Sequence, residues 1–211
     1  MVNKIISNYL SIQDNLKPNV KLIAVSKTFD LNEIRPLIDH GHLHFGENKF
    51  QEASSKWAEV IRNNKQLNLH MIGKLQSNKA KKAVDLFNYI HSLDNEKLSD
   101  VLSKAEKEKN KKLNYFIQVN IGDEDQKSGI NSKNLSSFFR YCTKENKLNV
   151  IGLMAIPPLG KNTFYFERMK ELNDSLNLKE LSMGMSSDYQ EAIKNGATFI
   201  RLGTSIFGSR D

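Results

Sequence analysis

Residues 20–41 read VKLIAVSKTFDLNEIRPLIDHG and contain one complete strand–helix unit. Residues 20–25 are nearly all apolar, as in a strand that is buried on both faces of a sheet. Ile34, Leu37 and Ile38 then fall on one face of a helix over residues 31–40, and Gly41 stands where a glycine commonly ends a helix. A strand followed by a helix of this length is the repeating unit of parallel α/β folds.

The same alternation continues along the chain. Further apolar runs predict strands over residues 42–45, 68–72, 87–91, 115–121, 150–156, 181–185 and 199–202. Helical patterns separate them over residues 49–62, 77–86, 135–143 and 188–195, and in two more segments whose expected N-caps are Asp94 and Thr163. An additional helix over residues 2–10 comes first. Eight strand–helix units predict a single TIM-type (β/α)8 barrel with an extra N-terminal helix, as one domain over residues 1–211.

The composition excludes several classes of protein. The chain has 31 Lys+Arg and 24 Asp+Glu, a formal net charge of +7, and 39% hydrophobic residues, which is typical of a globular domain. The apolar runs are too short to span a bilayer, and the first residues lack the apolar block of a secretory signal. The single cysteine, Cys142, excludes an internal disulfide and a thiolate metal cluster. We therefore expect a cytoplasmic protein without a metal site, in which Cys142 is a buried thiol.

The positive charge does not by itself indicate a nucleic-acid partner. Lysines are spread along the chain, and the run over residues 104–112 includes Glu106 and Glu108 at helical spacing, which is typical of a solvated helix face. No recognised nucleic-acid motif accompanies the charge. The sequence predicts a weak attraction for phosphate and no specific nucleic-acid binding.

Lys27 follows the first predicted strand. In a barrel of this kind, chemistry takes place at the carboxyl ends of the strands and in the loops that follow them. A lysine that points into the barrel is costly to bury as a cation, so its amine becomes nucleophilic and can condense with an aldehyde or ketone to a Schiff base. Position alone also permits a second interpretation, in which Lys27 extends from the barrel mouth into solvent.

The next two strand ends are polar but less specific. The second ends in FGEN, residues 45–48, where Gly46 permits close approach of the backbone to a ligand and Asn48 can donate and accept hydrogen bonds. Asn48 is equally suited to cap the following helix. The polar residues 73–79 after the third strand can likewise belong to a capped helix with a basic surface.

The last two strand ends carry small hydroxyl residues. The seventh strand leads into GMSSD, residues 184–188, and the eighth ends in RLGTS, residues 201–205. Barrel enzymes often bind phosphate with these two loops and the first N–H groups of a short helix. Ser186, Gly203 and Thr204 could each belong to a helix cap, but the two loops together favour a phosphate site. Arg201 can pair with a carboxylate or bind a ligand inside the barrel.

A lysine after strand one and a phosphate site after strands seven and eight form the arrangement of barrels that bind pyridoxal 5′-phosphate (PLP). Several segments also match a known family in the same order along the chain. They are AVSKT (24–28), FGEN (45–48) with QE (51–52), IG (72–73) with LQSNK (75–79), VNI (119–121) with KSG (127–129), GLM (152–154), LSMGMS (181–186) with Asp188, and RLGT (201–204) with IFG (206–208). With these segments the chain resembles the pyridoxal phosphate homeostasis proteins, relatives of the N-terminal barrel domain of alanine racemase.

The resemblance implies a role for each candidate residue. Lys27 would carry PLP as a Schiff base, Ser186, Gly203 and Thr204 would hold the phosphate, Arg201 would face the pyridine nitrogen, and Asn48 would line the pocket. Two departures are visible: Leu69 and Met71 stand where the family more often has aromatic residues, and the segment after Met154 is short. Neither departure removes an implied cofactor contact.

The implied contacts favour a PLP carrier over an enzyme. Arg201 would keep the pyridine nitrogen unprotonated, because two positive charges repel, and an unprotonated ring is a poorer electron sink. The related racemase takes its second base from a C-terminal domain, and this chain stops at Asp211 without one. We therefore expect a monomer that binds PLP and supplies it to apo-enzymes, without substantial turnover.

Two enzyme hypotheses stay open. The first is a PLP-dependent amino-acid racemase, in which Tyr165 or Tyr189 would approach from a loop as the second base. The second is a Schiff-base aldolase without cofactor, in which Lys27 would react directly with a sugar phosphate.

Overall fold

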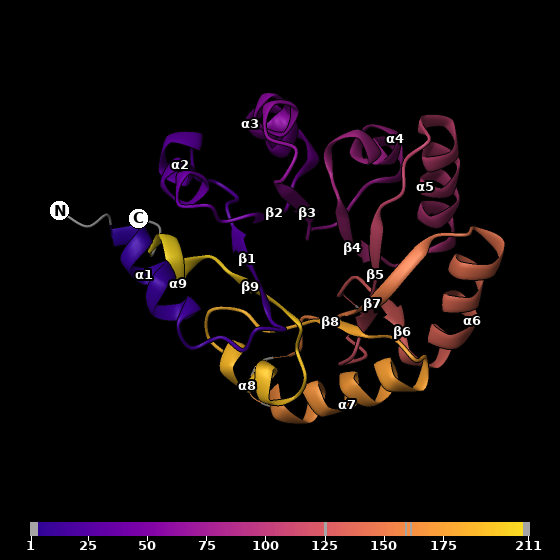
Figure 1. Ribbon diagram of the computed structural model, residues 1–211. Helices are drawn as coiled ribbons and strands as arrows, with labels where there is room; N and C mark the ends of the chain where they lie inside the picture. The colour runs from indigo at the N-terminus through magenta and orange to yellow at the C-terminus, as the bar shows by residue number, and fades with distance from the viewer. Residues whose placement is uncertain (1–3, 125, 159, 161, 209–211) are drawn as a thin grey trace.

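Short apolar runs form the strands, and an amphipathic helix follows nearly every one of them (Figure 1). The computed structural model describes residues 4–124, 126–158, 160 and 162–208. Its strands are β1 (Lys21–Val25), β2 (His44–Glu47), β3 (Asn68–Met71), β4 (Tyr89–Leu93), β5 (Asn114–Asn120), β6 (Ile130–Asn131), β7 (Asn149–Met154), β8 (Glu180–Ser182) and β9 (Phe199–Leu202). Its helices are α1 (Lys4–Gln13), α2 (Leu31–Asp39), α3 (Phe50–Asn63), α4 (Ser77–Leu86), α5 (Glu96–Lys109), the 3₁₀ turn η1 (Ser132–Asn134), α6 (Leu135–Arg140), the π-helical segment η2 (Tyr141–Glu145), α7 (Asn162–Ser175), α8 (Tyr189–Lys194) and α9 (Thr204–Phe207).

The sheet closes on itself. Each strand lies parallel to its neighbours in the order β4-β3-β2-β1-β9-β8-β7-β5, and β4 pairs with β5, with Ile90 opposite Tyr115. In the described part of the chain, β1–β5 and β7–β9 thus form a closed eight-stranded barrel, and the predicted TIM-type fold is confirmed. The helices surround the strands, and α1 lies beside α9, where Asn8 Nδ2 donates to the Ile206 carbonyl at 3.0 Å (Figure 1).

Side chains alternate between the inside and the outside of the barrel. Leu22 and Ala24 of β1 belong to the apolar layer between the barrel and its helices. Ile23, between them, lies inside the barrel with Phe116 and Phe199. The alternation follows from the two-residue period of a strand. Because it continues past the strand ends, it decides which loop residues reach the barrel interior.

The two predicted N-caps Asp94 and Thr163 are wrong. Asn95, not Asp94, caps α5: its backbone is extended and its side chain accepts a hydrogen bond from the Leu98 N–H at 2.9 Å. Thr163 lies inside α7 instead of capping it. Asp and Asn are both good caps, so the sequence pattern does not distinguish between adjacent candidates.

The helix predicted over residues 135–143 is divided. After α6 the backbone widens into η2, where the Asn146 N–H donates to the Tyr141 carbonyl five residues earlier, at 3.1 Å. Cys142 lies in this segment and is fully buried, as expected. Burial raises the pKa of its thiol to about 11, although the Ser99 hydroxyl donates to it at 3.4 Å.

Four strands differ from their predicted bounds by two residues or more at one end or both. The strand predicted over 150–156 is β7 (Asn149–Met154). The strand predicted over 42–45 is β2 (His44–Glu47), and the one predicted over 87–91 is β4 (Tyr89–Leu93). The strand predicted over 181–185 is β8, which ends at Ser182 because Gly184 turns the chain with φ 91°. The two-residue strand β6, which extends β5, and the four-residue helix α9 were not predicted, because both are too short to show a period.

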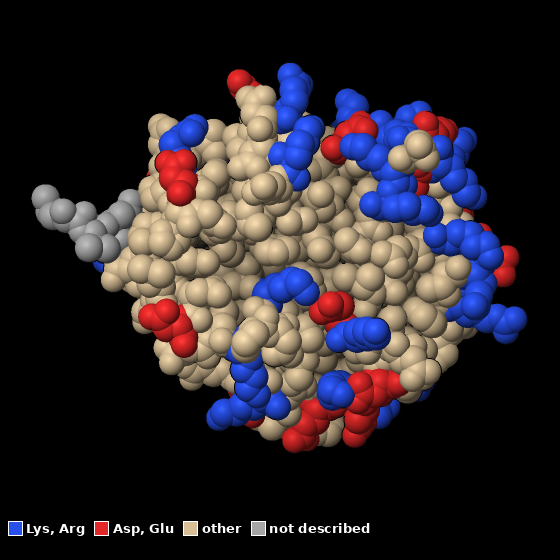
Figure 2. Space-filling model, in the orientation of Figure 1, with Lys and Arg blue, Asp and Glu red and all other residues tan. Residues whose placement is uncertain are grey.

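The basic run over residues 104–112 lies on α5 and the turn after it, where acidic groups accompany it. Lys81 Nζ lies 2.6 Å from Glu108, and Lys112 Nζ lies 3.0 Å from Glu106. Figure 2 shows acidic side chains among the basic ones over α4 and α5. This is the solvated helix face that the sequence predicts. None of the helices in the described residues is long and apolar enough to cross a membrane.

Candidate functional site

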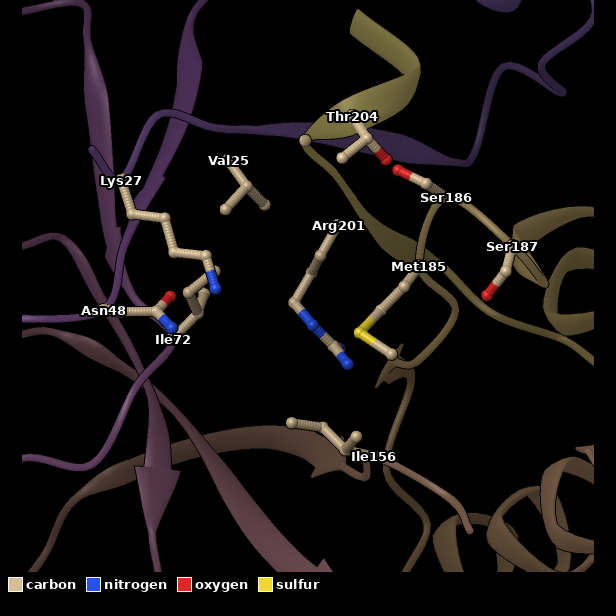
Figure 3. Close-up of a pocket in the computed structure, with 11 residues that line it drawn as sticks. Val25, Lys27, Asn48, Ile72, Ile156, Met185, Ser186, Ser187, Arg201 and Thr204 are labelled. Carbon is tan, nitrogen blue, oxygen red and sulfur yellow. The ribbon is translucent and has the colours of Figure 1, made fainter. Parts of the chain in front are cut away.

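A cavity of about 520 Å³ lies at the carboxyl ends of the barrel strands (Figure 3). Lys27, Ile156 and Arg201 reach it because each lies an even number of residues beyond a side chain that points into the barrel: Ile23, Met154 and Phe199, respectively. The described residues that line the cavity are Val25, Lys27, Asn48, Ile72, Ile156, Met185, Ser186, Ser187, Arg201, Gly203 and Thr204.

Lys27 enters the cavity from the loop after β1 and is half-buried. Figure 3 shows its amine pointing into the cavity, across from Arg201. The chain turns directly after it, because Thr28 lies in the left-handed region with φ 67°. The Thr28 N–H donates to the Glu52 carboxylate of α3. This contact holds an unfavourable turn and thereby directs Lys27 inward.

Glu47, at the end of β2, supports the same loop. Its Oε1 accepts hydrogen bonds from the Ser26 hydroxyl at 2.7 Å, from Lys56 Nζ at 3.0 Å and from Trp57 Nε1 at 2.9 Å. Lys56 Nζ also donates to the Ser26 carbonyl at 2.8 Å. Glu47 is fully buried and the Lys56 side chain is 10% exposed, so each charge depends on the other. Together they anchor the residue that precedes Lys27.

Asn48 is placed by close contact between two loops. A Cβ atom on Gly73 would lie 2.8 Å from the Asn48 Cα atom, so only glycine permits this approach. The side chain of Asn48 lies on the same side of the cavity as Lys27 (Figure 3). Lys49 is the N-cap of α3. The alternative in which Asn48 serves as that cap is therefore wrong.

The loops after β8 and β9 meet at the opposite edge of the cavity. Ser186 Oγ accepts a hydrogen bond from the Ser205 N–H in the first turn of α9 at 3.3 Å. Figure 3 shows the hydroxyls of Ser186 and Thr204 facing each other. A Cβ atom on Gly203 would approach Val25 no closer than 3.6 Å, so protein packing does not require glycine there. Small hydroxyls and helix-start N–H groups suit an anion that fills this space.

The loop after β8 is held in place by Gly184 and Asp188. The Gly184 carbonyl accepts from the Arg201 N–H at 3.0 Å, although β8 has already ended. The two Asp188 oxygens accept from the Met185 N–H at 2.6 Å and from Asn162 Nδ2 at 2.9 Å. These bonds at both ends give Ser186 a defined position.

Arg201 is a cation in the inner part of the cavity and is only 4% exposed. Its Nη1 donates to the Ser182 hydroxyl at 2.8 Å and its Nη2 to the Ala155 carbonyl at 3.1 Å. Burial lowers the pKa of Arg201 to about 10, while the negative charge of Asp188 acts in the opposite direction. The guanidinium is therefore protonated at neutral pH and offers a positive charge to any ligand in the cavity.

The structure brings the six predicted site residues to one cavity: Lys27, Asn48, Ser186, Arg201, Gly203 and Thr204. That they bind a cofactor stays a prediction. Tyr165 and Tyr189, the candidate second bases, are absent from the described residues that line the cavity.

The prediction missed five lining residues: Val25, Ile72, Ile156, Met185 and Ser187. For Ile72 and Ile156, the two-residue alternation from the strands before them is a signal that could have found them. Met185 and Ser187 depend on the conformation of the loop after Gly184, for which the sequence carries no comparable signal.

The chain is similar to known proteins over its whole length. The family model "Alanine racemase, N-terminal domain" matches residues 2–211. A pyridoxal phosphate homeostasis protein of Synechocystis sp. is 40% identical over 214 residues, which cover 97% of this chain and 98% of the relative. A protein of the same name from Escherichia coli K12 is 35% identical over 206 residues, which cover 91% of this chain and 86% of the relative.

Solved structures show the same barrel. PipY of Synechococcus elongatus, a structure with PLP bound, superimposes with a TM-score of 0.89 at 37% identity and covers 97% of this chain and 100% of its own. Alanine racemase of Clostridium difficile superimposes with a TM-score of 0.79 at 11% identity over 57% of its chain, a likeness of fold alone. The chain thus belongs to the family of the alanine racemase N-terminal domain and, within it, to the pyridoxal phosphate homeostasis proteins.

Proposed function

We propose that the protein binds PLP in this cavity and holds it as a Schiff base on Lys27. The phosphate would lie between the two hydroxyl-bearing loops, on Ser186, Gly203 and Thr204, and the pyridine nitrogen would face Arg201. One observation carries the proposal: the Lys27 amine and the Ser186 and Thr204 hydroxyls lie on different sides of one cavity, and the guanidinium lies between them in the view of Figure 3.

The size and polarity of the cavity fit this cofactor. About 520 Å³ lies within the usual range for small-ligand sites. The cavity offers an amine for an aldehyde, hydroxyls for a dianionic phosphate, and apolar walls at Ile72 and Ile156 for an aromatic ring. Asn48 adds a polar side chain next to Lys27. The names of the relatives and the PLP-bound PipY structure support the same ligand.

Each side chain has a distinct task in this proposal. PLP supplies an aldehyde, which condenses with an amine to a C=N bond and releases one water. Lys27 provides the amine, and the anchored loop behind it keeps the amine directed at the cavity. Ser186 and Thr204 orient the ligand by hydrogen bonds to its phosphate.

Titration with PLP tests the proposal. The wild-type protein should develop the visible absorption of a lysine Schiff base, and Lys27→Ala should bind PLP weakly without that band. Lys74→Ala is the matched control, since Lys74 lines a neighbouring hollow but not this cavity, and it should behave like the wild type. A wild-type protein that stays colourless in excess PLP would remove the proposal.

We further propose that the protein carries PLP and does not turn over amino acids. Protonation of the ring nitrogen beside the buried Arg201 would bring two positive charges together, which weakens the ring as an electron sink. Racemisation requires a second proton-transfer group. Of the described residues that line the cavity, only Lys27 and Arg201 have ionisable side chains.

Incubation of the PLP-loaded protein with L-alanine in deuterated water separates a carrier from a racemase. A carrier should show slow exchange of the Cα hydrogen and no D-alanine. Rapid exchange with accumulation of the D-isomer would establish the racemase alternative instead.

The proposed setting is the cytoplasm, with one PLP-binding domain over residues 1–211 acting as a monomer and without a nucleic-acid or membrane partner. Apo-enzymes that need PLP would be the recipients. Transfer can be measured by mixing the loaded protein with an apo-aminotransferase and a phosphatase that destroys free PLP. Recovery of aminotransferase activity under these conditions indicates hand-over, whereas full loss indicates simple release.

A further inference from the structure

A hydrogen-bonded chain of side chains runs through the barrel interior from Arg201 toward the opposite end. Arg201 Nη1 lies 2.8 Å from Ser182 Oγ, which lies 2.9 Å from His91 Nδ1. His91 Nε2 lies 2.9 Å from His70 Nδ1, and His70 Nε2 lies 3.0 Å from His44 Nδ1. Five strands contribute one residue each: β9, β8, β4, β3 and β2.

The middle of this chain is sealed from water. Ser182, His91 and His70 are fully buried, and His44 at the far end is half-buried. The His91 ring stacks on Phe116 with centroids 4.3 Å apart, and aromatic contacts also cover His70. Buried polar atoms need partners, and within the described residues both nitrogens of His91 and of His70 find theirs in the chain.

The arginine determines which atom donates and which accepts at each step of the hydrogen-bond chain. A guanidinium only donates, so the Ser182 oxygen accepts from Arg201. Among the described residues the partners of that hydroxyl are Arg201 and His91, so its own hydrogen is satisfied by donation to His91 Nδ1. His91 then carries its proton on Nε2 and donates to His70, which does the same toward His44. All three imidazoles are neutral Nε2–H tautomers in this arrangement.

A neutral chain suits the electrostatics of the interior. Burial holds the pKa of both His91 and His70 well below the usual value, and the nearby charge of Arg201 acts in the same direction on His91. Burial and the charge of Lys21 lower the pKa of His44 to about 4. None of the three therefore adds a positive charge at neutral pH.

We propose that Ser182 and His91, supported by His70 and His44, are positioning residues that orient Arg201 through a neutral, one-directional hydrogen-bond chain. A carboxylate in the place of Ser182 would offset the charge that Arg201 presents to the cavity. The aligned dipoles of the Ser182 hydroxyl and the neutral imidazoles, in contrast, hold the guanidinium without neutralising its charge. That this charge acts on the pyridine nitrogen of PLP rests on the proposed function.

The first test needs no cofactor. In apoprotein labelled with ¹⁵N-histidine, long-range ¹H–¹⁵N spectra at pH 7 should show His91, His70 and His44 as neutral Nε2–H tautomers. Ser182→Ala should shift these signals toward a mixture of tautomers and leave His42 unchanged, because His42 bonds the His44 carbonyl outside the chain. An Nδ1–H tautomer or a protonated ring at His91 in the wild type would overturn the proposal.

The second test uses PLP labelled with ¹⁵N at its ring nitrogen. In the wild type this nitrogen should be unprotonated at pH 7, and Ser182→Ala should raise the pH at which it takes up a proton by about one unit. Ser92→Ala is the matched control, because Ser92 is a buried serine of β4 whose hydroxyl has no partner among the described residues. Equal midpoints for Ser182→Ala and Ser92→Ala would refute the positioning role.

The two tests separate this inference from the proposed function. If the wild-type protein binds no PLP, the proposed function fails, while the tautomers of the apoprotein still decide whether the chain exists. If PLP binds and the tautomers differ from those expected, the proposed hydrogen-bond chain is refuted and the proposed cofactor site is unaffected.

Discussion

Individual side chains at the cavity edge differ in how much they contribute to the stability of the fold. Thr204 is exposed and Ser186 is half-buried, so neither is needed for packing of the core. Lys27 and Arg201, in contrast, depend on neighbours that hold them inward: the Thr28 turn for the lysine and the Ser182 hydroxyl for the arginine. Substitutions at the hydroxyls therefore report on the ligand more directly than on stability.

Thr204→Val and Ser186→Ala should each weaken PLP binding roughly 10- to 100-fold. A hydrogen bond to a charged acceptor contributes about 1.5–3 kcal/mol, and 1.4 kcal/mol is about tenfold in affinity. Ser187→Ala is the control, since the Ser187 hydroxyl points away from the other two (Figure 3). Dissociation constants from absorbance titrations measure the effect. Unchanged affinity in both variants would place the phosphate elsewhere.

At this scale the sequence predicts some residues well and others not at all. Lys27 and Arg201 could be predicted because the alternation of a buried strand directs them inward. Ser182 could not, because its contact with Arg201 depends on the register of β8 against β9, in which Ser182 lies opposite Phe199. The Ala155 carbonyl is likewise a backbone contact that carries no side-chain signal.

Helix α3 stabilises the end of β2 and the loop after β1 through one buried ion pair. Lys56 of α3 contacts both Glu47 of β2 and the carbonyl of Ser26. The pair thereby connects three elements that border the Lys27 side of the cavity. The sequence motif FGEN marks Glu47, but the sequence does not show that its partner is a lysine nine residues later.

Glu47→Gln should lower the free energy of unfolding by about 1–3 kcal/mol, because it removes the buried carboxylate 3.0 Å from Lys56 Nζ, while Glu52 stays 3.1 Å away. Lys56→Met should destabilise the protein similarly, and the double variant should cost less than the two single effects added together. Urea unfolding provides the values. Lys81→Met, which breaks an exposed pair with Glu108, should have little effect. Strict additivity of the two buried substitutions would show that the pair is not coupled.

The whole barrel should be sensitive to acid because several histidines are buried as neutral rings. Burial lowers the pKa of His42 and of His44 to about 4, and it holds the pKa of His70 and His91 well below the usual value. An unfolded histidine takes up a proton near pH 6.5. The unfolded state thus binds more protons below that pH, so stability is complete above about 6.5 and falls as the pH approaches 4.

As the pH falls through this window, each such histidine should lower the free energy of unfolding by about 1.4 kcal/mol per pH unit. Urea unfolding at several pH values between 7 and 5 measures the slope. His42→Phe should reduce the slope by one proton, since it keeps the ring contacts with Tyr9 and Phe45 and removes the titrating group. A stability that is flat from pH 7 to 5 would contradict neutral burial of these rings.

More of the overall fold than of the site could be predicted from the sequence. Eight apolar runs separated by amphipathic helices suffice for a closed parallel barrel, because parallel strands need helical crossovers. The widening at η2, the short β6 and the histidine chain could not be predicted, because each depends on contacts between segments far apart in sequence. The two hydroxyl-bearing loops converge because the parallel strands β8 and β9, which they follow, are neighbours in the sheet.

Borohydride reduction of the PLP-loaded protein, followed by peptide mass mapping, identifies the lysine that carries the cofactor. Reduction converts the C=N bond of a Schiff base to a stable amine, so the modified lysine keeps the mass of the reduced cofactor. The added mass should appear on the peptide that carries Lys27 and should be lost in Lys27→Ala. A label on another lysine, or no label on a protein that retains PLP, would contradict a Schiff base on Lys27.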